Sequence, residues 1–225
     1  CQSNRCYTIE LKIGDSDYAR PPTNPAKFGE IRISGGGPAR RWNEGYSRVG
    51  LLFNGFASRS PRVLRQAYVT FVRPVLEYAS SVWSPHLKKL INAIERVQKH
   101  FSKRIKSLSH LCYTERLLAL DIEPLELRRL KSDLVLYYKM FNNLIALPST
   151  EYFSHSEPVY QTRSGGNRIN LPLCHSNCFK NDFFNRCIAC WNSLSSTTVN
   201  AESVSQFKIL LLSNDLSPYL HCDYF

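Results

Sequence analysis

The stretch AYVTFVRPVLEYASSVWSP, residues 67–85, reveals most about how this chain folds. Apolar pairs return every four positions between residues 63 and 76, which is the spacing of one broad buried face on an α-helix. We expect this helix to begin with Ser60 as its cap and Pro61 in its first turn. Pro74 lies inside the pattern, where its ring removes a backbone donor and disfavours a helical residue before it. The helix must therefore kink or split at Pro74.

The next segment predicts a second long helix, which we expect to begin at Ser84 and Pro85. Projected at about 100° per residue, its apolar residues share one arc of about 120°: they are Leu87, Leu90, Ile91, Ile94, Val97, Phe101 and Ile105. The opposite arc carries Lys88, Lys89, Arg96, Lys99, His100, Lys103, Arg104 and Lys106, with Glu95 as its one acid. A solvated face usually mixes both signs, so this stripe indicates binding to the phosphates of a nucleic acid. A soluble face with surplus lysine is the alternative.

A third helical unit is expected to begin at Thr114, to turn at residues 121–124 and to continue to about Ile145. Its predicted buried stripe consists of Leu127, Leu130, Leu134, Tyr137, Tyr138, Phe141, Leu144 and Ile145, whereas Arg128, Arg129, Lys131 and Lys139 are expected outside. Tyr137 and Tyr138 could stack on nucleobases, but at helical spacing within an apolar stripe we interpret them as core residues. Trp83 and Trp191 receive the same interpretation.

Four cysteines near the C-terminus raise the question of a metal site. Cys174, Cys178, Cys187 and Cys190 could supply four soft ligands to a tetrahedral zinc ion, although their spacing is that of no standard zinc ribbon or finger. On a helix over residues 180–191, Cys187 would share one face with Phe183, Phe184, Ile188 and Trp191, with Cys190 at its margin. We therefore predict buried thiols and no metal, with zinc as the alternative.

The composition indicates a globular chain with a polyanionic partner. Its formal charge is +11 and its isoelectric point is near 9.4, while 43% of its residues are hydrophobic. We find no secretory signal or membrane-spanning run in the sequence, so we expect an intracellular protein of the cytoplasm and nucleus, with reduced thiols and no membrane partner. The chain starts at Cys1 and its one methionine is Met140, which indicates a fragment.

The pattern along the chain predicts a mainly α fold in three parts. Residues 1–45 are polar and rich in proline and glycine, so we expect a flexible or unrelated segment. Residues 46–147 predict a helical, thumb-like bundle. Residues 148–225 predict a smaller, mixed or helical C-terminal extension.

Spaced blocks of the chain also match a known pattern. They are VRPVLEYASSVW at 72–83, IERVQKHFSKRI at 94–105, YTERLLAL at 113–120, LELRRL at 125–130, DLVLYYK at 133–139, Thr162-Arg163, FFNRCIACWNSL at 183–194 and VSQFKIL at 204–210. In this order, they make residues 48–212 resemble the region after the palm in reverse transcriptases of non-LTR retrotransposons, the jockey-like LINE group. That family's proteins are RNA-directed DNA polymerases with an apurinic-type endonuclease.

The resemblance implies a thumb and C-terminal extension that grip an RNA and DNA template–primer duplex. It also implies that this sequence lacks the palm and fingers that would complete the parent polymerase. Such polymerases hold magnesium on palm carboxylates that include an aromatic-x-Asp-Asp turn, and no such turn occurs in this sequence. Asp15 and Asp17 lie in a polar segment without flanking apolar strands. We therefore expect no catalytic residue, no cofactor and no enzyme activity in this chain alone. A stand-alone nucleic-acid-binding module and a non-functional remnant of an element are the alternatives.

Overall fold

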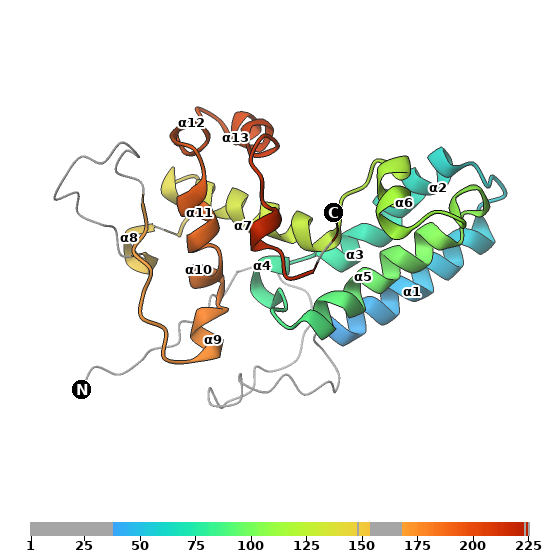
Figure 1. Cartoon of the computed structure of the whole chain (residues 1–225), viewed down its shortest axis with the longest axis horizontal. Helices are drawn as coiled ribbons and strands as arrows, with labels where there is room; N and C mark the ends of the chain where they lie inside the picture. The colour runs from blue at the N-terminus through green and yellow to red at the C-terminus, as the bar shows by residue number, and fades with distance from the viewer. Residues whose placement is uncertain (1–37, 148, 154–167, 223, 225) are drawn as a thin grey trace. The chain divides into compact units, whose positions relative to one another are not determined.

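The computed structural model describes residues 38–147, 149–153, 168–222 and 224, and this part of the chain is helical and contains no strand. The mainly α fold class is thereby confirmed. The described α-helices are α1 (Pro38–Gly55), α2 (Pro61–Ala67), α3 (Arg73–Glu77), α4 (Ser80–Trp83), α5 (Lys88–Lys103), α6 (Tyr113–Leu120), α7 (Leu125–Phe141), α8 (Ser149–Tyr152), α9 (Asn177–Lys180), α10 (Phe183–Arg186), α11 (Ile188–Ser193), α12 (Ser196–Val199) and α13 (Val204–Leu211) (Figure 1). The predicted flexible segment falls outside the described residues as far as residue 37, and α1 crosses its predicted boundary at residue 45.

The predicted break at Pro74 is present, in the form of a π-helical turn. Ser60 is the N-cap of α2 and Pro61 its first residue, although the Ser60 side chain makes no capping hydrogen bond. The π-helical turn η2 (Tyr68–Val72) joins α2 to α3, and the backbone N–H of Arg73 donates to the carbonyl of Tyr68, five residues earlier. Pro74 then lies in the first turn of α3, where the backbone donor that it lacks is not needed.

The first hydrophobic core lies among α1, η2, α3, α5 and α6. Its buried residues include Leu64, Leu76, Val97 and Phe101. Figure 1 shows α1 running along α5, and Gly45 of α1 lies where these helices approach closely. A Cβ atom at Gly45 would lie 2.8 Å from Leu76 Cδ2 and 3.1 Å from Val97 Cγ1. The absence of a side chain at this position therefore allows α1 to pack tightly against the buried side of α5.

The second core joins the C-terminal half of α7 to α10, α11 and α13. Trp191 and Phe207 are buried in it together with Tyr137 and Tyr138. The Tyr137 hydroxyl donates to the carbonyl of Phe183 at 3.0 Å, and the Tyr138 hydroxyl donates to the carbonyl of Ala201. Both tyrosines and Trp191 are therefore core residues, as predicted, and are not available to stack on bases.

Several predicted helix boundaries were wrong. α5 begins at Lys88, because residues 84–87 form a short irregular link. Cys112, not Thr114, caps α6, through a capping box in which its sulfur accepts from the backbone N–H of Glu115. α7 ends at Phe141, which leaves Leu144 exposed. The single helix expected over residues 180–191 is two short helices, α10 and α11, that meet at Cys187.

An ion pair between the partly buried Arg186 and the buried Asp133 joins α10 to α7, and a hydrogen bond from Arg186 adds α4. The guanidinium of Arg186 in α10 donates to Asp133 Oδ2 in α7 through Nε at 3.0 Å and Nη2 at 2.8 Å, and Nη2 also donates to the carbonyl of Ser81 in α4 at 2.8 Å.

Over the described ranges, no helix is long and apolar enough to cross a bilayer.

Candidate nucleic-acid interface

Helix α5 has two chemically distinct sides. Ile91, Ile94, Val97 and Phe101 are buried, as the apolar spacing predicted, and Ile105 is buried just after the helix. Leu90 is half-buried and Leu87 is exposed, so the buried stripe is shorter at its start than predicted. At about 100° per residue, all the cations of the helix project into the remaining half-turn.

Glu95 does not lie on the cationic side, where the sequence analysis placed it. Its side chain is 0% exposed, and the Tyr113 hydroxyl and the backbone N–H of Leu125 both donate to its carboxylate. Burial raises the pKa of Glu95, although these two donors and Arg129 oppose the rise. The one acid of α5 is thus inside the protein, and the outward side of the helix carries no carboxylate.

Buried hydrogen bonds determine which side of α5 faces outward. The Tyr68 hydroxyl donates to Gln98 Oε1 at 2.9 Å, and Gln98 Nε2 donates to the Tyr113 hydroxyl at 3.1 Å and to the carbonyl of Glu123 at 2.9 Å. Rotation of α5 about its axis would leave these polar groups unsatisfied in the interior, at a cost of about 1–3 kcal/mol for each group. The network therefore holds the cations toward solvent.

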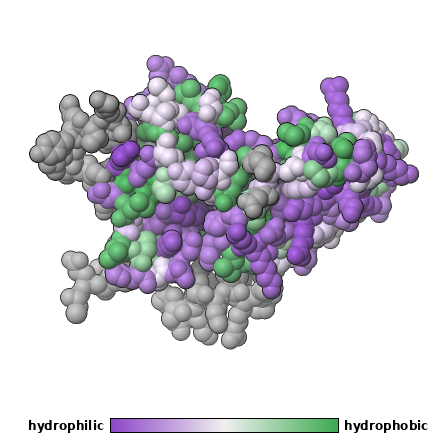
Figure 2. All heavy atoms as spheres, in the orientation of Figure 1, coloured by the Kyte–Doolittle hydropathy of each residue, from purple (hydrophilic) through white to green (hydrophobic). Residues whose placement is uncertain are grey.

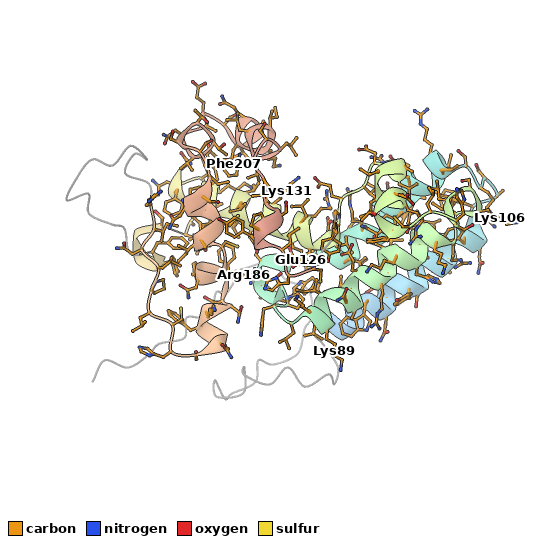
Figure 3. All side chains as sticks on the ribbon, in the orientation of Figure 1. Lys89, Lys106, Glu126, Lys131, Arg186 and Phe207 are labelled. Carbon is orange, nitrogen blue, oxygen red and sulfur yellow. The ribbon has the colours of Figure 1, made fainter. Side chains whose placement is uncertain are left out.

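Four cations of α5 are solvent-exposed and have no partner among the described residues. Lys88, Lys89, Arg96 and Lys103 are exposed, and in the part of the chain that the structure describes none of them forms an ion pair or hydrogen bond. Lys106 is also exposed but belongs to the 3₁₀ turn η3 (Lys106–Leu108). Figure 3 shows Lys89 and Lys106 near opposite ends of α5, and Figure 2 shows hydrophilic residues over the surface that α1 and α5 form.

The exposed cations of α5 and Lys106 form a cationic surface, and two cations at its edges lie over aromatic rings. The Lys99 ammonium lies 5.0 Å from the centre of the Tyr113 ring, and the Arg104 guanidinium lies 4.4 Å from the centre of the Phe53 ring. Arg59, which the sequence analysis did not include, lies over the same Phe53 ring at 5.9 Å. These contacts hold the cations in place without neutralising them.

His100 differs from the other predicted site residues in its charge. Its ring makes an edge contact with Tyr46 at 5.5 Å between ring centres. Partial burial and the positive charge of Arg104 lower the pKa of His100. The imidazole is therefore mostly neutral at physiological pH and adds little positive charge to the surface.

Three cations of α7 are paired with acids or buried, unlike those of α5. Arg128 of α7 pairs with Glu77, and Lys131 pairs with Glu123. Arg129 was predicted to be exposed, but its side chain is only 2% exposed and its guanidinium has no hydrogen-bond partner among the described residues. Its burial follows from its position between the two cores, close to the charges of Glu95 and Glu126.

The four cysteines of the alternative zinc site differ in burial. Cys187 and Cys190 are buried in the second core, as the helical spacing predicted, and burial raises the pKa of both thiols, that of Cys190 to about 12. Cys178 is exposed and Cys174 is half-buried on the preceding segment. Among the described residues, no cluster of three or more His, Cys, Asp or Glu side chains suits a metal ion.

Comparison of the chain with protein-family models, with curated proteins and with solved structures produced no match.

Proposed function

We propose that this chain is the C-terminal part of a retrotransposon reverse transcriptase and that α5 grips the template–primer duplex through its phosphates. The observation that carries the proposal is the segregation of charge on α5, where the one acid is buried and the cations form no ion pair with any described residue. The order of the sequence blocks that resemble non-LTR reverse transcriptases supports it independently.

The dimensions of α5 suit contacts along one side of a duplex. Sixteen residues make a helix about 24 Å long, which is the length of about seven base pairs at about 3.4 Å each. Lysine and arginine side chains that reach phosphates position a protein on a duplex without reading its sequence. We expect binding that depends on salt and is largely indifferent to sequence, to RNA/DNA hybrids and DNA duplexes alike.

The test is the salt dependence of binding, measured by fluorescence anisotropy with an RNA/DNA hybrid and a DNA duplex. In the triple variant Lys89→Ala, Arg96→Ala, Lys103→Ala, three exposed cations without partners are removed. We expect weaker binding to both duplexes and a slope of log affinity against log salt that is smaller by about 2 to 3, because each phosphate contact contributes about 0.7 to 0.9. Circular dichroism should show unchanged folding.

The matched control removes the same charge elsewhere. Arg62, Lys180 and Lys208 are exposed on α2, α9 and α13, and no described residue pairs with them. Their triple replacement by alanine should change the slope of log affinity against log salt by less than the contribution of one phosphate contact. Equal losses of affinity in both triple variants would mean that binding depends only on net charge and not on the cations of α5. A wild-type chain that folds but binds neither duplex would favour a non-functional remnant.

A further inference from the structure

A cation and two aromatic rings form a compact cluster just before α5. The Arg41 guanidinium of α1 lies 5.5 Å from the centre of the Tyr78 ring and 5.0 Å from the centre of the Trp83 ring. Arg41 Nη1 donates to the carbonyl of Tyr78 at 2.8 Å, and Trp83 Nε1 donates to the same carbonyl at 2.7 Å. We call these three residues the aromatic cluster.

The backbone at Ala79 makes this cluster possible. Ala79 has φ of 51° and ψ of 33°, a left-handed conformation that costs a non-glycine residue energy. This residue separates α3 from α4, and the carbonyl of Tyr78 is directed to the Arg41 and Trp83 side chains. Two side chains from separate helices are thus held in place by one carbonyl.

The cluster is accessible to a ligand. The Tyr78 side chain is 58% exposed and the neighbouring Val82 is 68% exposed, whereas Trp83 packs in part against the first core. A large exposed aromatic ring beside a fixed guanidinium is a surface on which a nucleobase can stack, because every base presents a π-face and arginine stacks on such faces as well.

The cluster is also close to the cationic surface of α5. Only residues 84–87 separate Trp83 from Lys88, so even a fully extended chain would place these residues at most about 18 Å apart. A strand whose phosphates lie along α5 can therefore reach the cluster within a few nucleotides.

We propose that Tyr78, with Arg41 and Trp83, stacks an unpaired nucleobase next to the duplex that α5 grips. The proposal rests on the proposed function, because α5 would bring the strand to the cluster. It adds a contact with a base to contacts that otherwise involve only phosphates, and it predicts a preference for a duplex with a single-stranded overhang.

The test compares three DNA duplexes: one with blunt ends, one with a four-nucleotide overhang, and one whose overhang is abasic. The abasic overhang keeps the phosphates and lacks the bases. We expect the wild-type chain to bind the natural overhang at least about fivefold more tightly than the abasic one, as the loss of one base stack implies. Tyr78→Ala should abolish this preference and leave affinity for the blunt duplex unchanged, whereas Tyr78→Phe should keep it.

Phe179→Ala is the matched control, because Phe179 is also a large exposed aromatic residue, on α9. It should leave the preference for the natural overhang intact. Equal binding of natural and abasic overhangs, with salt-dependent binding of the blunt duplex, would overturn the stacking proposal and retain the grip by α5. A loss of affinity for all three duplexes in Tyr78→Ala would assign Tyr78 a structural role instead. Failure of the wild-type chain to bind any of them would overturn both proposals.

Discussion

Helices α5 and α7 have similar lengths and several cations each, yet they use these cations in opposite ways. On α5, Lys89 and Lys103 face solvent, and no residue in the described ranges pairs with them. On α7, Arg128 and Lys131 pair with the carboxylates of Glu77 and Glu123, and Arg129 is buried. The number of basic residues on a helix therefore does not identify a binding surface. The presence or absence of acidic partners in the tertiary structure distinguishes the two helices.

This difference predicts separate consequences for stability and for binding. Removal of charges from α7 and its partners should lower the free energy of unfolding, because these charges connect elements of the fold. Removal of exposed charges from α5 should change the affinity for nucleic acid instead. The α5 triple variant above tests the second half of this comparison, and the following experiments test the remainder.

The largest effect is expected at the ion pair between Arg186 and Asp133 of α7. Arg186→Ala should lower the free energy of unfolding by about 3–5 kcal/mol, because it leaves the Asp133 carboxylate buried without its partner. Urea denaturation followed by circular dichroism measures this loss. The double variant Arg186→Met, Asp133→Leu should recover most of it, since no unpaired charge remains. A loss below 1 kcal/mol in the single variant would show that the pair does not hold α7 to α10.

An intermediate effect is expected at Glu95, on the buried side of α5. Burial raises the pKa of this carboxyl in the folded protein above its unfolded value, so the folded state holds a proton that the unfolded state has released. The contribution of Glu95 to stability should therefore fall as the pH rises above about 4.3, the ordinary pKa of glutamate, until the folded pKa is passed.

Glu95→Gln removes this titration and keeps an oxygen that can accept from Tyr113. Its stability relative to the wild-type chain should increase between pH 4 and pH 8, as measured by urea denaturation at each pH. Parallel curves for the two proteins would mean that Glu95 does not titrate differently in the folded and unfolded states.

The smallest effect is expected at His100, on the outward side of α5. Since burial and Arg104 lower the pKa of His100, its imidazole is mostly neutral at pH 7.5. His100→Gln should therefore change the slope of log affinity against log salt by less than the contribution of one phosphate contact. As the pH falls toward 5.5, protonation adds a charge that a nearby phosphate favours, so the wild-type chain should gain affinity relative to the variant. A constant ratio of affinities across this range would place His100 away from the bound phosphates.

The periodic features of the sequence predicted much of the fold. Four-residue spacing identified the buried side of α5, the core positions of Tyr137 and Tyr138, and the burial of Cys187 and Cys190. Pro74 identified the break between α2 and α3, because its effect on a helix is local. Local signals were weaker at helix ends, where Cys112 replaced Thr114 as the cap of α6 and α5 began four residues later than expected.

The candidate site was predictable only in part, because its cations could be counted but their partners could not. The aromatic cluster had no signal at all, since Arg41 lies 37 residues before Tyr78 and the left-handed backbone of Ala79 has no residue signature. Arg59, which shares the Phe53 ring with Arg104, was missed for the same reason.

The sequence by itself determined the helical class, the apolar faces and the excess of positive charge, because periodicity and composition act over one or two turns of helix. Only the tertiary structure decided which charges remain free. Glu95 is buried because Tyr113 and the backbone of Leu125, 18 and 30 residues away, supply its donors, and Arg129 is buried because α7 lies in both cores. The cationic surface of α5 thus depends on contacts between segments that are distant in the sequence, and these contacts remove its one acid from the surface.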